Sequence, residues 1–197
     1  MTWWDDCMAI LLEELLVPDA AAWRAWLSEH HANHPGVRLV LHKKGGTTTE
    51  LTYAQAVDQA LCFGWIDGQR TGRDEHSHYN RFTPRTARSK WSVRNVANIK
   101  RLSELGLLAP SGLAAVEAAQ ADGRWDDAYE GQATAKLPQD FLDAVEGHPR
   151  AQEKLQTLSG AERFAIYYRL HTVKGADTRQ KKIAGYLARL DAGEGIL

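Results

Sequence analysis

A cluster of basic side chains is the part of the sequence best suited to binding chemistry. The segment from Arg70 to Arg101 contains nine Lys or Arg residues and two acids, whereas the whole chain has a formal net charge of −1. Guanidinium groups bind carboxylates and phosphates through paired hydrogen bonds, and a helix N-terminus adds free N–H donors. The segment therefore predicts a site for a small anionic ligand or for an acidic protein surface. The residues expected to contact the ligand are Trp65, Asp67, Arg81, Arg85, Ser89, Trp91 and Asn95.

The same arginines also have a purely structural interpretation. They can pair with Asp67 and with the acids near the N-terminus, which would hold a predicted β-hairpin against the helices. Structural ion-pair networks and anion sites share this sequence pattern, so both interpretations stay open at this stage.

Asp67 is the acid most suited to chemistry, because it follows Trp65 and Ile66 in a predicted strand. Side chains alternate along a strand, so Asp67 is expected to share a face with Trp65. A buried carboxylate needs a partner, which we expect to be Arg81 or Arg85 across the hairpin. An alternative hypothesis is therefore a small enzyme centred on Asp67 as general base with these two arginines. The sequence shows no nucleophile beside Asp67, so it assigns no catalytic residue.

Histidine pairs raise the question of a metal site. His76 and His78 would project from one face of a strand, and His30 and His34 lie one turn apart on a predicted helix. No Cys or acid at close spacing completes either pair. We therefore expect exposed histidines, no metal site and no cofactor.

Nucleic-acid binding is the other alternative function. Basic residues at 81–101 and 174–189 have the charge and reach that phosphate contacts require. The nearly neutral total charge disfavours it, because it leaves only two local basic patches.

The composition is that of a globular protein with a sizeable core, at 197 residues, 44% hydrophobic and 25% charged. The first twenty residues contain five acids and no Lys or Arg, which is unlike an export signal. The apolar run 9–17 is interrupted by two glutamates and is too short to span a bilayer. We expect a cytoplasmic protein without a membrane span; the oligomeric state is not indicated.

The elements that must position the candidate residues are expected to form an α+β fold. Over residues 11–128 we expect a small antiparallel sheet covered by helices, with a hairpin of strands 65–69 and 78–83. Thr52 and Gln55 have the spacing of a capping box at a helix start. The other predicted elements are strands at 11–17 and 37–42, and helices that begin at Pro18, Thr52, Ser89 or Ser92, and Pro110.

A C-terminal helical unit is predicted at 137–192, after a linker at 122–137. A short helix is expected at 138–146, followed by two helices with apolar faces at the spacing of packed helices. These faces are Phe164, Tyr167, Tyr168 and His171 in one helix, and Ile183, Tyr186, Leu187 and Leu190 in the other.

Two blocks of sequence carry a resemblance to a known family. The first is ALCFGWIDGQ at 60–69, followed by RFTPR at 81–85 and by Trp91-Ser92. The second is the closing pattern Lys174, Thr178-Arg179 and Lys182-Ile183. These blocks resemble the YdeI/OmpD-associated family over roughly residues 12–192, and the first block is the more specific.

The resemblance implies association with an outer-membrane porin and protection against bacteriocins or cationic peptides. It also implies a periplasmic location, from which this sequence departs because its first residues do not resemble an export signal. On this basis we expect a non-catalytic binding or stress-protection protein with an anion-receptive, arginine-rich site.

Overall fold

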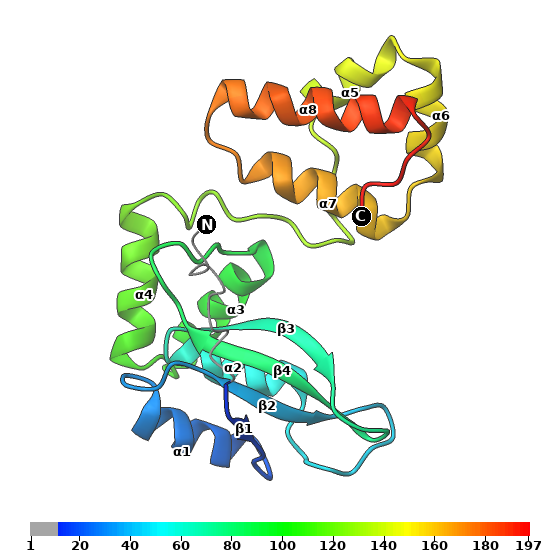
Figure 1. The fold of residues 1–197 in the computed structure, drawn as a ribbon. Coiled ribbons are helices and arrows are strands. Elements are labelled where there is room, and N and C mark those ends of the chain that lie inside the picture. Colours follow the sequence, from blue (N-terminus) through cyan, green and yellow to red (C-terminus); the bar gives the residue numbers. More distant parts are fainter. Residues whose placement is uncertain (1–11) are drawn as a thin grey trace, which may run out of the picture. The chain divides into compact units, whose positions relative to one another are not determined.

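The computed structural model describes residues 12–197, which form two compact units (Figure 1). The N-terminal unit comprises 12–90 and 95–127, and the C-terminal unit comprises 91–94 and 128–197. The described residues form eight helices and one four-stranded sheet. The predicted α+β class is therefore confirmed, whereas the division into an α+β domain at 11–128 and a C-terminal helical unit at 137–192 stays a prediction.

The sheet of the N-terminal unit has the strand order β1-β2-β4-β3. Strand β2 (Val37–His42) pairs antiparallel with β4 (Ser77–Pro84), which pairs antiparallel with β3 (Trp65–Gly72). Strand β1 (Glu14–Leu15) runs parallel to β2, so the sheet is mixed rather than purely antiparallel. The predicted strand at 11–17 is thus reduced to two residues, and Leu11 lies outside the described residues.

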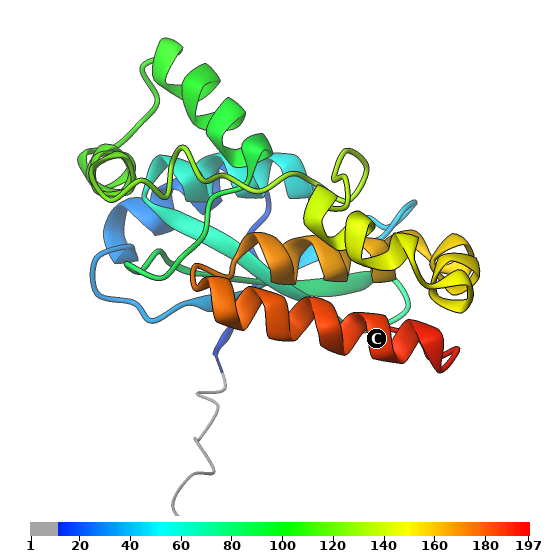
Figure 2. The same cartoon turned by 90° about the horizontal axis from the view of Figure 1, so that it is seen from above.

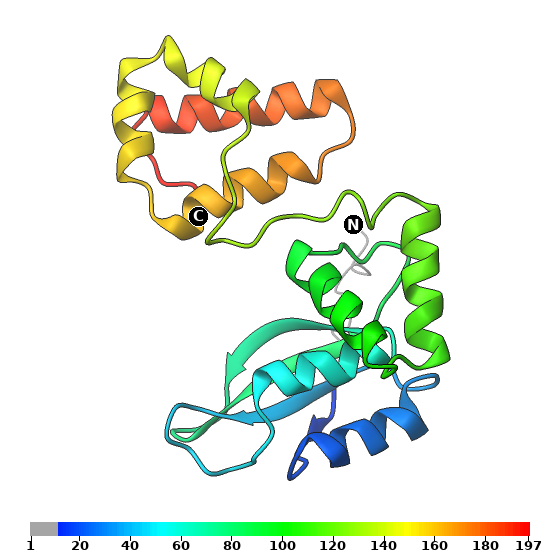
Figure 3. The same cartoon turned by 180° about the vertical axis from the view of Figure 1, so that it is seen from behind.

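One face of the sheet is buried by helices. Helix α1 (Ala20–His30) and helix α2 (Tyr53–Cys62) lie on the same side of the sheet (Figures 2 and 3). Trp23 of α1 is fully buried, stacks edge-on against Phe82 of β4, and donates its indole N–H to the Ala56 carbonyl oxygen of α2 at 3.1 Å. This tryptophan therefore ties both helices to the sheet.

The ends of α2 follow from the sequence. The predicted capping box is present, because Thr52 accepts from the Gln55 backbone N–H and the Gln55 side chain accepts from the Thr52 backbone N–H. Gly64 adopts a φ of +74° just after the helix, a conformation that glycine reaches without steric cost. The turn leads directly into β3, and Asp67 follows three residues later.

Helix α4 (Pro110–Ala121) and helix α3 (Val93–Glu104), apart from the first two residues of α3, complete the described part of the N-terminal unit. Proline at the first position of α4 is favourable because its missing N–H would have had no partner within the helix. A Cβ on Gly112 would lie 2.2 Å from the Cys62 carbonyl oxygen, so α4 packs backbone to backbone against the end of α2.

The C-terminal unit contains α5 (Gln139–Glu146), α6 (Pro149–Thr157), α7 (Gly160–His171) and α8 (Ala176–Asp191). The sequence did not predict α6, which buries only Ala151 and Leu155. In α7 the buried residues are Ile166 and Leu170, whereas the predicted aromatic face is only half-buried. The predicted face of α8 is confirmed, since Ile183, Tyr186 and Leu190 are buried in the shared core.

Arg179, from the Thr-Arg block near the end of the chain, joins three of these helices. Its guanidinium donates to both carboxylate oxygens of Asp140 in α5, at 2.6 and 2.8 Å. It also donates to the Leu170 carbonyl oxygen at the end of α7, at 2.6 Å. Arg179 therefore links α5, α7 and α8 within the C-terminal unit.

Candidate functional site

The hairpin places Asp67 and Arg81 on opposite faces of the sheet. Asp67 pairs directly with Phe82, whose side chain points into the core, so the neighbouring Arg81 points the other way. Arg81 is exposed, and among the described residues no ion pair links it to Asp67. The predicted buried pair is therefore wrong, because the strand alternation that turns Asp67 inward turns Arg81 outward. Tyr53 of α2 takes the place of the arginine and donates its hydroxyl to Asp67 at 2.6 Å.

Three other predicted site residues have structural contacts in the N-terminal unit. Trp65 is 1% exposed, packs edge-on against Trp23, and donates its indole N–H to the His31 carbonyl oxygen at 3.1 Å. Arg85 donates to the Lys90 carbonyl oxygen at 3.1 Å, which braces the loop between β4 and α3. In the same loop the Ser89 hydroxyl accepts from a backbone N–H at 2.9 Å. These contacts support the structural interpretation of the loop.

Trp91 and Asn95 are both buried, but they belong to different units. The Trp91 carbonyl oxygen accepts from the Tyr129 backbone N–H at 2.9 Å within the C-terminal unit. Ligand contact by either residue stays a prediction. Within the N-terminal unit, the opposite orientations of Asp67 and Arg81 separate two of the seven predicted residues.

Asp67 instead lines a cavity of about 560 Å³ in the N-terminal unit, here called the sheet pocket. Its walls come from the end of β2, the loop that follows it, the start of α2, and strands β3 and β4. The lining residues are Leu41, His42, Lys43, Lys44, Leu51, Thr52, Tyr53, Asp67, Gly68, Arg70, His78 and Asn80.

A bulge in β3 brings Arg70 into the sheet pocket. The pairing register shifts between Asp67, which faces Phe82, and Arg70, which faces Asn80. The three residues from Asp67 to Arg70 in β3 therefore pair with the two from Phe82 to Asn80 in β4. As a result, the Arg70 side chain lies on the same face of the sheet as Asp67. A β-bulge commonly re-aims side chains beside functional sites in this way.

The floor of the sheet pocket contains two buried polar side chains from β4. His78 is 6% exposed and Asn80 is 4% exposed. Among the described residues, His78 Nδ1 and Asn80 Oδ1 have no hydrogen-bond partner. Burial and then the positive charge of Arg70 lower the pKa of His78, and together they outweigh the neighbouring Asn80 side chain, which raises it, so the neutral imidazole predominates at pH 7. The prediction of an exposed His78 is wrong, because it lies on the same face as buried Phe82.

The outer part of the sheet pocket is predominantly cationic. Lys44 and Arg70 are exposed, and Lys43 is half-buried with its ammonium group donating to the Asp74 carbonyl oxygen. Asp67 is the one carboxylate among the lining residues, so three cations face one anion. The start of α2 at Tyr53 adds the positive end of a helix dipole. The residues that line the sheet pocket therefore carry a net positive charge.

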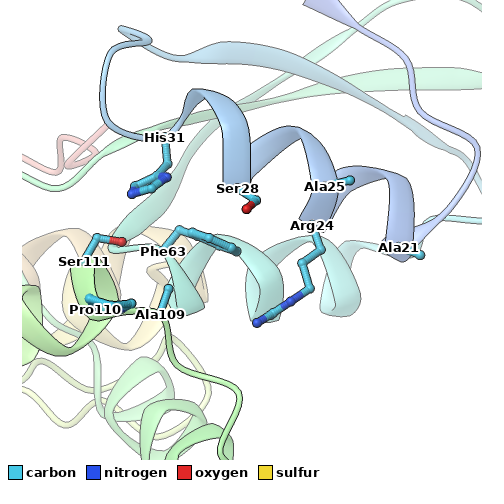
Figure 4. Close-up of a pocket in the computed structure, with 9 residues that line it drawn as sticks. All are labelled: Ala21, Arg24, Ala25, Ser28, His31, Phe63, Ala109, Pro110 and Ser111. Atoms are coloured by element: carbon cyan, nitrogen blue, oxygen red, sulfur yellow. The ribbon is translucent and has the colours of Figure 1, made fainter.

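A second cavity, of about 760 Å³, lies between α1 and the start of α4 (Figure 4). Figure 4 shows Arg24 on one side of it, with Phe63 between Arg24 and the α4 residues. Arg24 already donates to the Gln59 side chain at 2.8 Å and to the Leu107 carbonyl oxygen at 2.9 Å. Its guanidinium also lies 5.3 Å from the Phe63 ring centroid. Although this cavity is larger, its one cation is committed to structural contacts.

His30 and His34 also have structural contacts, whereas His76 is exposed. The His30 ring stacks on Trp26 with 4.7 Å between centroids, and His34 lies 3.1 Å from a Glu13 carboxylate oxygen. Across residues 12–197, no cluster of three or more His, Cys, Asp or Glu could hold a metal ion. No helix in the same range has the length and apolarity needed to cross a bilayer.

Sequence analysis missed most of the sheet pocket. Lys43, Lys44 and Asn80 were not among the predicted site residues. A usable signal did exist in the alternation of the strand. His78, Asn80 and Phe82 lie on one face, and because Phe82 is apolar, this face is expected to point toward the core.

Two family models match the chain. Residues 15–115 match a family described as a domain of unknown function (DUF8412). Residues 134–193 match a family described as bacteriocin-protection, YdeI or OmpD-associated. The sheet pocket and the 60–69 block fall within the first match, and the closing Thr-Arg block falls within the second. The comparisons with curated proteins and with solved structures found no match.

Proposed function

We propose that this chain, which belongs to the DUF8412 family over residues 15–115 and matches the YdeI/OmpD-associated family over 134–193, is a ligand-binding protein of the YdeI/OmpD-associated type. Its N-terminal unit takes a small anionic ligand in the sheet pocket. Under this proposal, the protective role in the family description is exerted through binding rather than through catalysis.

The observation that carries the proposal is the charge imbalance around a concave site. Lys43, Lys44 and Arg70 line a cavity that contains one carboxylate, Asp67, which is already engaged by a tyrosine hydroxyl. Cations converging on a cavity with a buried floor attract an anion more strongly than the same charges on a flat surface. The buried neutral His78 adds hydrogen-bonding capacity without adding charge.

The enzyme hypothesis loses its geometric basis. It required Asp67 beside Arg81 and Arg85, but Arg81 points away from the Asp67 face and Arg85 braces a loop. In the sheet pocket Asp67 accepts the Tyr53 hydroxyl, an arrangement that positions the carboxylate. Binding therefore accounts for these groups more simply than general-base catalysis does.

The nucleic-acid hypothesis is also weakened by ion pairs within each unit. Arg101 donates to both carboxylate oxygens of Asp58 at 2.7 Å, and Arg179 pairs with Asp140. Arg189 lies 3.6 Å from a Glu194 carboxylate oxygen. Each pair reduces the positive charge that the basic segments at 81–101 and 174–189 offer to phosphates.

Calorimetric titration of the full chain with inorganic phosphate and with sulfate tests the proposal. We expect saturable binding that weakens as NaCl is raised from about 0.05 to 0.5 M, because exposed cations are screened over roughly 10 Å at 0.1 M salt. Arg70→Ala should weaken binding at least severalfold. Arg81→Ala is the matched control, since Arg81 is also an exposed arginine of the hairpin but lies on the other face.

Two results would refute the proposal. One is the absence of a binding heat and of any rise in melting temperature with millimolar phosphate or sulfate. The other is an equal loss of binding in Arg81→Ala and Arg70→Ala, which would indicate nonspecific attraction to surface charge.

A further inference from the structure

The size of the sheet pocket exceeds what a simple inorganic anion fills. Its volume of about 560 Å³ lies within the range of about 300–1,000 Å³ that accommodates small organic molecules. In bulk liquid a water molecule occupies about 30 Å³, so a lone phosphate would leave most of the cavity to solvent. The ligand therefore has a body in addition to its anionic group.

The floor of the pocket indicates the chemistry of that body. His78 and Asn80 are two residues apart on β4, so their Cα atoms are separated by about 6.6 Å. His78 is neutral, and both side chains keep a buried polar atom without a partner among the described residues. Neutral imidazole and carboxamide groups both donate and accept hydrogen bonds. These two side chains match uncharged hydroxyl or amide groups on a ligand ring whose width is similar to the separation of about 6.6 Å between the two Cα atoms.

The remaining walls suit the faces of such a ring. Leu41 and Leu51 are buried, with exposures of 1% and 0%, and they line the same cavity as His78. Apolar side chains beside a few placed polar groups are typical of sites for small organic ligands. The anionic end of the ligand belongs at the outer part, where Lys44 and Arg70 are exposed.

We infer that the ligand of the sheet pocket is an organic phosphate, whose uncharged, hydrogen-bonding ring contacts His78 and Asn80 while its phosphate contacts Lys43, Lys44 and Arg70. A phosphate dianion fits three cations opposed by one carboxylate better than a monoanionic carboxylate does. Sugar phosphates and nucleoside monophosphates share this chemistry. The inference rests on the proposed function, because it assumes that the pocket binds anions.

Calorimetry on the full wild-type chain tests this inference with five probes: inorganic phosphate, glucose 6-phosphate, adenosine 5′-monophosphate, glucose and adenosine. We expect at least one of the two organic phosphates to bind roughly tenfold more tightly than inorganic phosphate, the gain of one or two net hydrogen bonds. Glucose and adenosine should bind more weakly than their phosphates. The tighter of the two phosphates identifies the ring as a sugar or a nucleoside.

Asn80→Leu provides the matched variant, and its melting curve verifies that it is folded. In this variant the dissociation constant of inorganic phosphate divided by that of the organic phosphate should fall toward one. Arg81→Ala should keep the preference of the wild type. If the variant does not fold, the comparison of probes on the wild type still decides.

The outcomes separate this inference from the proposed function. Equal affinities of the wild type for inorganic phosphate and for both organic phosphates would overturn the inference while leaving anion binding intact. An unchanged preference in folded Asn80→Leu would overturn the assignment of the floor. If no anion binds, the proposed function fails, and the inference fails with it.

Discussion

Replacing Asn80 by leucine is expected to stabilise the unliganded protein, although Asn80 is buried in the sheet. Leucine has the same number and branching of side-chain heavy atoms as asparagine. Asn80 is 4% exposed, and its Oδ1 has no hydrogen-bond partner among the described residues. A buried polar group without a partner costs about 1–3 kcal/mol, and leucine removes that cost.

The magnitude follows from two opposing contributions. Relief of the desolvation penalty contributes about 1–3 kcal/mol, whereas the bulkier methyl groups cost up to about 1 kcal/mol where they crowd the floor. The open pocket beside Asn80 limits that crowding. We expect a net gain of about 1 kcal/mol in the free energy of unfolding. At this chain length that gain raises the melting temperature by about 3 °C.

Thr49→Val is the matched control for this substitution. Thr49 is 6% exposed, and its hydroxyl donates to the Val17 carbonyl oxygen at 2.6 Å and accepts from the Leu51 N–H at 3.1 Å. Valine has nearly the same shape but leaves both partners unsatisfied, so we expect a loss of about 1–3 kcal/mol. Circular-dichroism melts and urea titrations of the two variants measure both changes. If Asn80→Leu lowers the melting temperature as much as Thr49→Val does, the amide is satisfied and the reasoning is refuted.

Three further predictions concern packing, helix closure and pH. Gly112→Ala should lower the free energy of unfolding by about 1–3 kcal/mol, because its Cβ would lie 2.2 Å from a backbone oxygen. Gly185→Ala, inside α8 with nothing within 4 Å of its Cβ, should raise the free energy of unfolding by about 0.5–1 kcal/mol; urea titration measures both changes. Arg179→Ala should cost about 1–2 kcal/mol by breaking its hydrogen bonds to α5 and α7, and the exposed Lys181→Ala should change little in the same assay. Because the pKa of His78 lies below 6.5 in the folded state, the unfolded chain binds more protons, so stability should fall as the pH drops below about 6.5; if melts of His78→Gln between pH 7 and 5 show the same slope as the wild type, this assignment is wrong.

The elements that the sequence predicted well are those controlled by local chemistry. The Thr52 capping box and the proline start of α4 each satisfy a backbone requirement within a few residues. Strand β2 shows a local alternation and has the predicted bounds. Helix α6 was missed because two buried residues, Ala151 and Leu155, give too weak a periodic pattern.

The candidate site was harder to predict because it depends on registers between strands. The sequence shows that Asp67 and Arg81 lie on neighbouring strands, but the side on which each lies follows from which residues pair. The bulge that returns Arg70 to the Asp67 face has no clear local signal beyond Gly68. Lys43 and Lys44 enter the pocket only because β2 pairs with β4, a contact between distant parts of the chain. Long-range pairing of this kind cannot be inferred from composition or spacing.

The unsatisfied floor of the sheet pocket leads to a last prediction, that ligand reverses the order of stability between the wild type and Asn80→Leu. Without ligand, the wild type bears the cost of the buried Oδ1 of Asn80, which the leucine variant lacks, and should melt at the lower temperature. A ligand that binds only the folded state adds about 2.7 kcal/mol at one hundred times its dissociation constant. At the same concentration a leucine variant with a tenfold higher dissociation constant gains about 1.4 kcal/mol, so the wild type gains about 1.3 kcal/mol more, which exceeds the variant's expected advantage of about 1 kcal/mol. Melts of both proteins across a concentration series of the tighter-binding organic phosphate should therefore cross, with the wild type becoming the more stable. Parallel curves that never cross would mean that Asn80 does not contact the ligand, because the ligand would then stabilise both proteins equally.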